Sequence, residues 1–220
     1  MPKPSIKRAV IFANGLLNNL DSAREVILED DLLIAADGGA RHCLKLGFIP
    51  KILIGDFDSL NDNELASLQS AGTEIIRHPA QKDYTDLEIA LRHAQSLGVV
   101  EILVMGALGA RWDQTMANLL LPVTADFFDV HIRLIDGSQE VMLLRGGNTL
   151  NIHGQGGDIV SLIPLGGNAY GITTHGLEYP LDGETLFFGA TRGVSNVLLN
   201  EDATIQLRDG LLLCTVIHIE

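Results

Sequence analysis

Cysteine, basic residues and long apolar runs are all scarce in this 220-residue sequence, and each scarcity excludes a class of protein. Its two cysteines, Cys43 and Cys214, lie far apart and form no Cys/His ligand pattern, which argues against a zinc–thiolate site. We interpret them as reduced thiols and predict a cytoplasmic protein. No apolar run approaches the roughly 18 residues that a membrane span needs, so we predict no membrane partner.

Basic residues are outnumbered by acidic ones, 15 against 28, and the formal net charge is −13. Nucleic acids and anionic membranes attract basic surfaces, so neither is expected as a partner. Any anion that this protein binds must be neutralised locally. The basic N-terminus leads into an apolar run that stops at Asn14 without a cleavage-site pattern, so we interpret that run as a first strand rather than a signal peptide.

Short apolar runs alternate with helix-like segments over the first half of the chain. The predicted strands are residues 9–12, 32–36, 52–54, 73–76, 102–105 and 130–135, and the predicted helices are residues 22–29, 39–46, 61–71, 86–97 and 112–125. Thr85-Asp86-Leu87-Glu88 has the pattern of a capping box. Trp112 is expected to pack in the core. Apolar strands separated by helices indicate an α/β fold, with a mostly parallel sheet flanked by helices.

The second half of the chain contains short β-rich runs broken by Gly, Asn and Pro. The predicted strands there are residues 140–144, 158–164, 172–175, 185–188, 204–207 and 211–219. Regular turn signals between short strands are typical of an antiparallel β-sandwich. We therefore predict two domains, an α/β domain at residues 1–137 and a C-terminal antiparallel β-sandwich at residues 138–220.

Carboxylates gather where the predicted parallel strands end. They are Asp37 after the second strand, Asp56 and Asp58 after the third, and Asp83 and Asp86 after the fourth. Ligands of open α/β sheets bind at this edge, so we expect these side chains to converge. Two unit charges about 4 Å apart repel by roughly 4 kcal/mol at an effective dielectric near 20, so a counter-ion is required. Mg²⁺ suits such a site because it takes carboxylate oxygens and completes its shell with water and phosphates.

A glycine-containing loop, residues 106–111, follows the fifth strand and precedes a helix. Its backbone and the helix N-terminus can approach phosphate oxygens, and Arg111 can contact phosphate bidentately. Asp113 and Gln114 either orient Arg111 or touch the ligand, and Lys82 is the other nearby cation. Each motif alone is also typical of a turn, a helix cap or a solvated surface. Their shared position favours metal and phosphate binding, which is the chemistry that phosphoryl transfer needs.

Six ordered segments resemble the thiamine pyrophosphokinase family. They are Ala36-Asp37-Gly38-Gly39-Ala40, Gly55-Asp56-Phe57-Asp58-Ser59, Pro79 with Lys82-Asp83-Tyr84-Thr85-Asp86, Gly106-Ala107-Leu108-Gly109-Ala110-Arg111-Trp112-Asp113-Gln114, Gly176-Leu177-Glu178-Tyr179-Pro180-Leu181 and Ser195-Asn196. The resemblance implies transfer of a pyrophosphoryl group from ATP to the hydroxyl of thiamine, which gives thiamine diphosphate and AMP. It also implies a homodimer whose active sites lie between the subunits.

The resemblance also implies roles for individual residues. Asp56, Asp58 and Asp86 are expected to bind Mg²⁺, and Asp37 and Asp83 are expected to lie next to these ligands. The expected nucleotide-site residues are Asp37, Gly38, Lys82, Gly109, Arg111, Asp113 and Gln114, and Asp83 and Arg111 join the Mg²⁺ ligands in catalysis. Tyr179 resembles the position that stacks on thiamine, and Ser195 and Asn196 resemble those that hold its aminopyrimidine; from the residues alone these loops are ordinary hairpin turns. Two positions depart from the family: Arg41 stands where Asn is frequent, and Gln114 stands where many bacterial members have His.

Three alternatives remain at this point. A metal-dependent phosphatase could use an Asp-x-Asp motif, although such enzymes usually carry it after the first strand and Asp56 follows the third. A pyrophosphokinase for a pterin or another alcohol is opposed by the loops around Tyr179 and Ser195. A nucleotide-sensing module that is not an enzyme has no need of five clustered acids.

Overall fold

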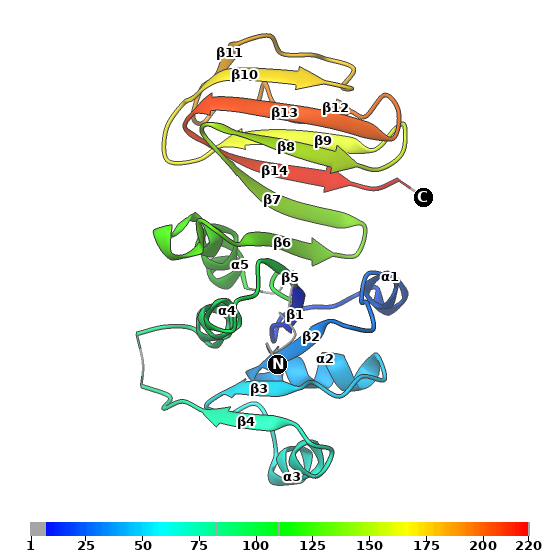
Figure 1. The fold of residues 1–220 in the computed structure, drawn as a ribbon, viewed down its shortest axis with the longest axis vertical. Helices are drawn as coiled ribbons and strands as arrows, with labels where there is room; N and C mark the ends of the chain where they lie inside the picture. Colours follow the sequence, from blue (N-terminus) through cyan, green and yellow to red (C-terminus); the bar gives the residue numbers. More distant parts are fainter. Residues whose placement is uncertain (1–7, 82, 110, 220) are drawn as a thin grey trace, which may run out of the picture. The chain divides into compact units, whose positions relative to one another are not determined.

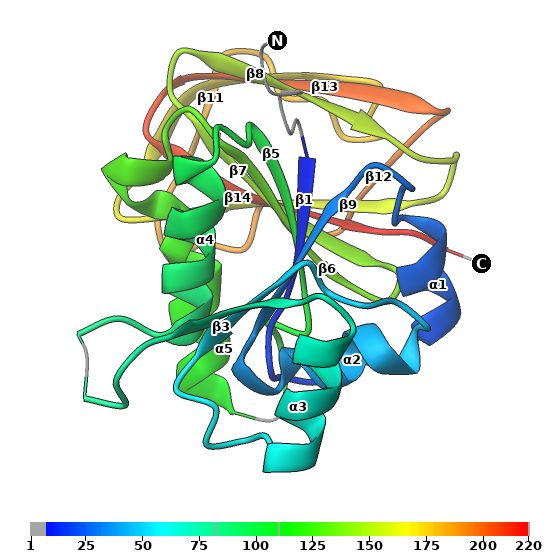
Figure 2. The ribbon, with the colours of Figure 1, turned by 60° about the horizontal axis from the view of Figure 1, so that its bottom comes forward.

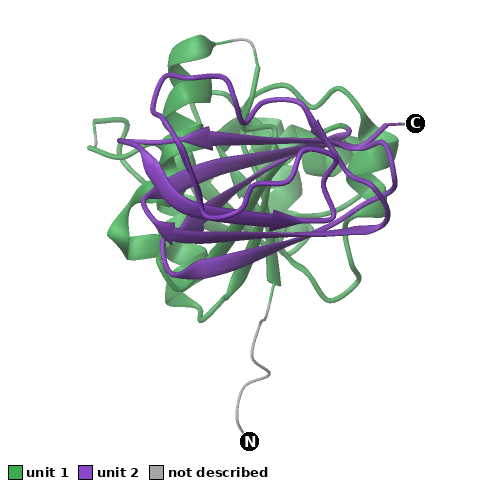
Figure 3. Ribbon diagram, turned by 90° about the horizontal axis from the view of Figure 1, so that it is seen from above, with its two compact units in different colours: residues 1–137 green, residues 138–220 purple. Residues whose placement is uncertain are grey.

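The α/β segment and the β-rich segment form two separate units, Met1–Gly137 (unit 1) and Ser138–Glu220 (unit 2) (Figure 3). The computed structural model describes residues 8–81, 83–109 and 111–219. It confirms the predicted fold class, because the strands of unit 1 pair in parallel and are flanked by helices, whereas the strands of unit 2 pair antiparallel in two layers. No helix among the described residues is long and apolar enough to cross a membrane.

The apolar runs of unit 1 form a sheet in which every neighbouring pair of strands is parallel. The strands are β1 (Arg8–Phe12), β2 (Leu32–Ala36), β3 (Ile52–Gly55), β4 (Glu74–Arg77), β5 (Glu101–Met105) and β6 (His131–Asp136). Their order within the unit is β6-β5-β1-β2-β3-β4 (Figure 1). The chain therefore builds the sheet outward from β1 to β4 and then returns to place β5 on the other side of β1. This reversal is a topological switch point, where open α/β sheets bind their ligands.

Helices cover both faces of this sheet. They are α1 (Leu20–Glu25), α2 (Ala40–Lys45), α3 (Asp62–Ser70), α4 (Asp86–Ser96) and α5 (Trp112–Leu120), with 3₁₀ turns η1 (Asp37–Gly39), η2 (Leu121–Val123) and η3 (Ala125–Phe127). Helix α4 lies on one face, and α1, α2 and α3 lie on the other (Figures 1 and 2). Successive side chains of a strand point to opposite faces of the sheet. Val10 and Phe12 therefore point to the same face, where they pack in the cluster that includes Cys43 of α2.

Two predicted helix features differ from the structure. Helix α5 ends at Leu120 rather than at residue 125, because Pro122 lacks an N–H donor and cannot continue a helix. Thr85 caps α4 by accepting a hydrogen bond from the Glu88 amide (3.2 Å), but the Glu88 carboxylate pairs with Arg92 (2.9 Å). The Thr85 half of the predicted capping box is therefore present. The Glu88 side chain instead supports the helix through an i,i+4 ion pair.

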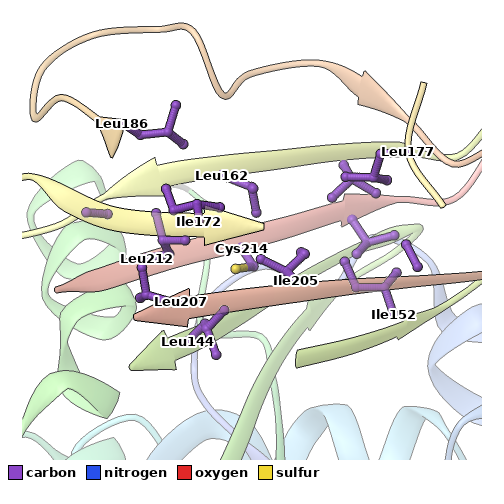
Figure 4. Packing of buried hydrophobic residues seen from close by; sticks show 14 of the residues in the cluster. Leu144, Ile152, Leu162, Ile172, Leu177, Leu186, Ile205, Leu207, Leu212 and Cys214 are labelled. Carbon is purple, nitrogen blue, oxygen red and sulfur yellow. The ribbon is translucent and has the colours of Figure 1, made fainter. Parts of the chain in front are cut away.

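Within unit 2 the strands form a sandwich of two layers, each of four antiparallel strands. One layer has the order β12 (Asn196–Val197), β9 (Ile159–Pro164), β14 (Leu211–Ile217) and β7 (Gln139–Arg145). The other has the order β11 (Glu184–Leu186), β10 (Ala169–His175), β13 (Asp202–Asp209) and β8 (Asn148–His153). Leu144, Ile172, Ile205 and Leu212 meet in the core between them (Figure 4). Strands β8 and β12 were not predicted. In β8 only Ile152 is buried, and β12 has two residues, so neither shows an apolar run.

A buried carboxylate ties the end of β14 to the turn that precedes β9. The Asp158 side chain is fully buried and accepts hydrogen bonds from the Ile219 amide (3.0 Å), the Gln155 amide (3.0 Å) and His218 Nδ1 (2.7 Å). Burial alone would raise the pKa of Asp158, but these donors outweigh it and hold the pKa below its usual value. The C-terminal strand is thus anchored by an ionised group.

Both cysteines are free and buried. Burial raises the pKa of the Cys43 thiol and raises that of Cys214 to about 12. A thiol reacts as its thiolate, which the raised pKa disfavours at both cysteines.

Candidate active site

Three carboxylates converge where β2 and β3 end. Asp37 begins η1 directly after β2, Asp56 and Asp58 follow β3, and one carboxylate oxygen of each lies within 4.8 Å of the others. Asp86, the first residue of α4, adjoins this group, because its Oδ1 lies 3.2 Å from the position that a Cβ on Gly55 would take. The structure therefore brings Asp37, Asp56 and Asp58 together at the carboxyl edge of the sheet, and Asp86 lies beside Gly55 but is not one of the carboxylates that converge among the described residues.

The backbone is strained at the turns that carry these acids. Within the described residues, the non-glycine residues with positive φ are Asp37 (48°), Phe57 (68°) and Ser195 (61°). Such conformations cost about 1–3 kcal/mol each and cluster at functional sites. Phe57 is almost fully buried beneath the Arg77 guanidinium, which lies 4.7 Å from its ring centroid. This burial holds the left-handed turn between Asp56 and Asp58 in place.

Asp37 is the buried member of the cluster, with a relative exposure of 6%. Its Oδ2 faces the Asn14 amide nitrogen at 3.4 Å, and its Oδ1 is buried with no hydrogen-bond partner among the described residues. A buried carboxylate oxygen without a partner is costly unless a cation meets it. Carboxylate oxygens at this spacing are the donor set that Mg²⁺ takes, so the residues present fit that ion.

The loop after β5 places an arginine at the start of α5. The Gly109 amide donates to Thr115 Oγ1 (3.1 Å), which ties the loop to the helix. Arg111 pairs with Asp113 through Nε (3.1 Å to Oδ1) and Nη2, and this hydrogen bond is the main cause of the lowered pKa of Asp113. Asp113 therefore orients Arg111, one of the two roles predicted for it, while Gln114 is exposed on the first turn of α5.

Several predicted residues lie elsewhere or outside the described ranges. Asp83 is exposed and, within the part of the chain that the structure describes, is not one of the carboxylates that converge. Lys82 lies outside the described residues, as does Ala110 of the glycine-containing loop. Trp112 was expected in the core, and this was wrong: it is 83% exposed, because α5 buries none of its residues. Arg41, the departure from the family after η1, is held bidentately by Glu64 of α3 (2.7 and 2.9 Å).

The sequence did not single out the segment that follows β1. Gly15 donates its amide to the Gly106 carbonyl (2.7 Å), and the Gly15 carbonyl accepts from His42 Nε2 (2.9 Å). Burial lowers the pKa of His42, which favours the neutral ring that makes this single donation. Asn14 contacts both Asp37 and Ser59. The available signal was Asn14-Gly15 at the end of the first strand, which is the same position that marked the acidic motifs after β2 and β3.

In unit 2 the predicted thiamine-site residues form a small hydrogen-bonded group. Asn196 Oδ1 accepts from the Tyr179 amide (3.0 Å), and Asn196 Nδ2 donates to the Tyr179 carbonyl (2.7 Å). The Ser195 amide donates to Ser161 Oγ (3.0 Å). The side-chain amide of Asn196 thus holds the backbone of Tyr179, and Tyr179 is 63% exposed. Tyr179 is therefore an exposed aromatic residue on a backbone that is held by hydrogen bonds.

Two family descriptions match the chain. "Thiamin pyrophosphokinase, catalytic domain" matches residues 23–134, and "Thiamin pyrophosphokinase, vitamin B1 binding domain" matches residues 148–212. The chain belongs to the thiamin pyrophosphokinase family. The resemblance of its six segments to this family is confirmed.

Individual members of the thiamin pyrophosphokinase family agree with this assignment. A thiamine pyrophosphokinase of Bacillus subtilis is 28% identical over 208 residues, which cover 94% of this chain and 97% of that protein. Thiamine pyrophosphokinase 1 of Arabidopsis thaliana is 29% identical over 205 residues, covering 82% of this chain and 76% of that protein. The crystal structure of a Bacillus subtilis thiamine pyrophosphokinase superposes with a TM-score of 0.87 at 27% identity and covers 97% of this chain and 100% of that one.

Proposed function

We propose that this member of the thiamin pyrophosphokinase family transfers the pyrophosphoryl group of ATP to the hydroxyl of thiamine, giving thiamine diphosphate and AMP. The observation that carries the proposal is the convergence of Asp37, Asp56 and Asp58 at the strand ends of a domain that matches the family's catalytic description. The family relatives do not favour the phosphatase, the pterin pyrophosphokinase or the nucleotide sensor.

We propose that Asp56, Asp58 and Asp86 hold Mg²⁺, with Asp37 beside them. The partnerless Oδ1 of Asp37 and the all-carboxylate donor set support this proposal. When bound, the ion neutralises charge on the phosphates that are transferred. The clustered side chains are carboxylates, so the bound ion also offsets their mutual repulsion.

The chain's own residues then position the reactants. The phosphates are held by the loop that contains Gly109, by the N-terminus of α5 and by Arg111, together with Gly38 of η1 and Lys82. The thiamine hydroxyl oxygen attacks the β-phosphorus, the bond from that phosphorus to the α,β-bridging oxygen breaks, and AMP departs. The hydroxyl proton passes to a carboxylate, for which Asp37 and Asp83 are the candidates. No covalent intermediate on the protein is involved.

We propose that thiamine stacks on Tyr179, whose face attracts the thiazolium cation by about 0.5–2 kcal/mol. Ser195 lines the same site, and Asn196 holds Tyr179 by its backbone. We also propose a homodimer with active sites at the subunit interface. Large apolar side chains exposed on each unit support this, among them Trp112 (83%) and Met116 (53%) in α5 and Phe187 (62%) in unit 2. The free, buried cysteines support the proposed cytoplasmic location.

The direct test is to mix the purified protein with Mg²⁺, ATP and thiamine and to separate the products by chromatography. We expect AMP and thiamine diphosphate in equal amounts, and neither in the presence of EDTA. Inorganic phosphate in place of AMP would indicate the phosphatase. AMP formed with a pterin alcohol but not with thiamine would indicate the other pyrophosphokinase.

The shared active site is tested by mixing two impaired variants, Asp58→Asn in unit 1 and Tyr179→Ala in unit 2, after unfolding and refolding them together. If each site takes one unit from each protomer, half of the dimers are mixed and carry one intact site. We then expect about a quarter of the wild-type activity to return, since a two-fold dimer has two equivalent sites. Activity no higher than the mean of the two variants refolded separately would contradict the shared site.

A further inference from the structure

Asn14 lies at the switch point of the parallel sheet, two residues beyond the end of β1. It precedes the stretch that matches the family's catalytic description, which begins at residue 23. The backbone on both sides of Asn14 is hydrogen-bonded to the end of β5, through the Ala13 amide to the Met105 carbonyl (2.8 Å) and through the Gly15 amide to the Gly106 carbonyl (2.7 Å). Asn14 is thus carried by a rigid part of the fold.

A chain of hydrogen bonds runs from Asn14 to two of the clustered carboxylates. Asn14 Nδ2 donates to Ser59 Oγ (3.0 Å) and to Asp37 Oδ2 (3.4 Å), and Ser59 Oγ donates to Asp58 Oδ1 (3.2 Å). An amide nitrogen has two hydrogens, and a hydroxyl both accepts and donates, so all of these bonds can form together. The sequence Asp37, Asn14, Ser59, Asp58 is therefore one continuous network.

The side chain of Asn14 is exposed, and its amide lies close against η1. A Cβ on Gly38 would lie 2.2 Å from Asn14 Oδ1, so the absence of a side chain in η1 makes room for the amide. Its oxygen side is thereby packed against η1 and its nitrogen side faces the two acceptors. The direction of donation is set by Asp37, because a carboxylate only accepts hydrogen bonds.

We propose that Asn14 and Ser59 form an uncharged bridge that sets the separation and rotation of Asp37 and Asp58 for a divalent cation. The bridge donates to Oδ2 of Asp37 and leaves the buried, partnerless Oδ1 for the ion. Neutral donors reduce the repulsion between carboxylates, whereas a lysine or arginine at this point would compete with the cation. Partners that orient metal-binding side chains typically contribute 10–100-fold to metal affinity or activity. Asn14 and Ser59 are positioning residues, and their role rests on the proposed metal site.

Mn²⁺ binding without substrates tests the bridge directly, because free and bound Mn²⁺ differ in their electron paramagnetic resonance signal. We expect Asn14→Ala to raise the Mn²⁺ dissociation constant about tenfold. In the assay, the Mg²⁺ concentration for half-maximal activity rises in parallel, while the KM for thiamine does not change. Asn63→Ala, at an exposed position of α3, is the matched control and binds Mn²⁺ as the wild type does.

Ser59→Ala breaks the same network at its other end, and it tests the proposed bridge if Asn14→Ala does not fold. We expect Ser59→Ala to weaken Mn²⁺ binding as well, and the double variant to lose less than the product of the two single effects, since both act through one network. Wild-type Mn²⁺ affinity in Asn14→Ala, or in Ser59→Ala if only that variant folds, would overturn the bridge. A wild-type protein that binds Mn²⁺ but makes no thiamine diphosphate would overturn the proposed function alone.

Discussion

Asp58→Asn abolishes pyrophosphoryl transfer and stabilises the metal-free protein. Stabilisation of transition-state charge by a metal ion is worth several kcal/mol, so losing one of its ligands lowers kcat by about 10³-fold or more. Without metal, the same change removes one of three carboxylates whose oxygens lie within 4.8 Å of one another, and with it their mutual repulsion. Loss of activity thus coincides with a raised free energy of unfolding.

Three measurements on Asp58→Asn check this result: the rate of AMP formation, Mn²⁺ binding, and thermal unfolding in EDTA. The matched control is Asp129→Asn, because Asp129 is exposed and is not one of the converging acids that the structure describes. The control is expected to show wild-type activity and Mn²⁺ affinity. A near-normal rate for Asp58→Asn in Mg²⁺ would remove Asp58 from the metal site.

Gly39→Ala destabilises unit 1 by about 3 kcal/mol or more, near the upper end for overpacked sites. A Cβ on Gly39 would lie 1.9 Å from the Phe12 carbonyl oxygen and 2.6 Å from its carbon. These are backbone atoms of β1, so no side-chain rotation relieves the contact and the end of η1 must move away from the sheet. The backbone of Gly39 is in the right-handed helical region (φ −56°), so the effect is purely steric.

Urea unfolding of Gly39→Ala, followed by circular dichroism, measures the loss. Gly167→Ala is the matched control, because a Cβ there has no atom within 4 Å and no positive φ is involved. We expect the control to stay within about 0.5 kcal/mol of the wild type. An equally small change for Gly39→Ala would show that β1 and η1 do not approach as closely in solution.

Regular elements of unit 1 were predictable because local chemistry and packing agree. Helix α4 has Leu87, Ala90, Leu91 and Ala94 at helical spacing, all four are buried, and Thr85 caps its start. Where local chemistry and tertiary packing disagree, the prediction failed. Trp112 is large and apolar yet exposed. The prediction placed it in the core because the local pattern does not show which face of α5 meets the rest of unit 1. In unit 2, β8 has only Leu150 and Ile152 as apolar residues, and its pairing with β13 makes it a strand.

The sequence by itself determined that the chain has a parallel α/β half and an antiparallel β half, and that acids follow successive strands. Strand type and side-chain period are local properties, and the ends of parallel strands meet at one edge whatever the details of packing. Only the tertiary structure decided which polar groups hold those acids. Asn14 meets Asp37 across 23 residues and Ser59 across 45, and Asn196 meets Tyr179 across 17. Contacts at such separations depend on how strands and loops are arranged in space, and a position at a strand end does not show which side chain a residue meets.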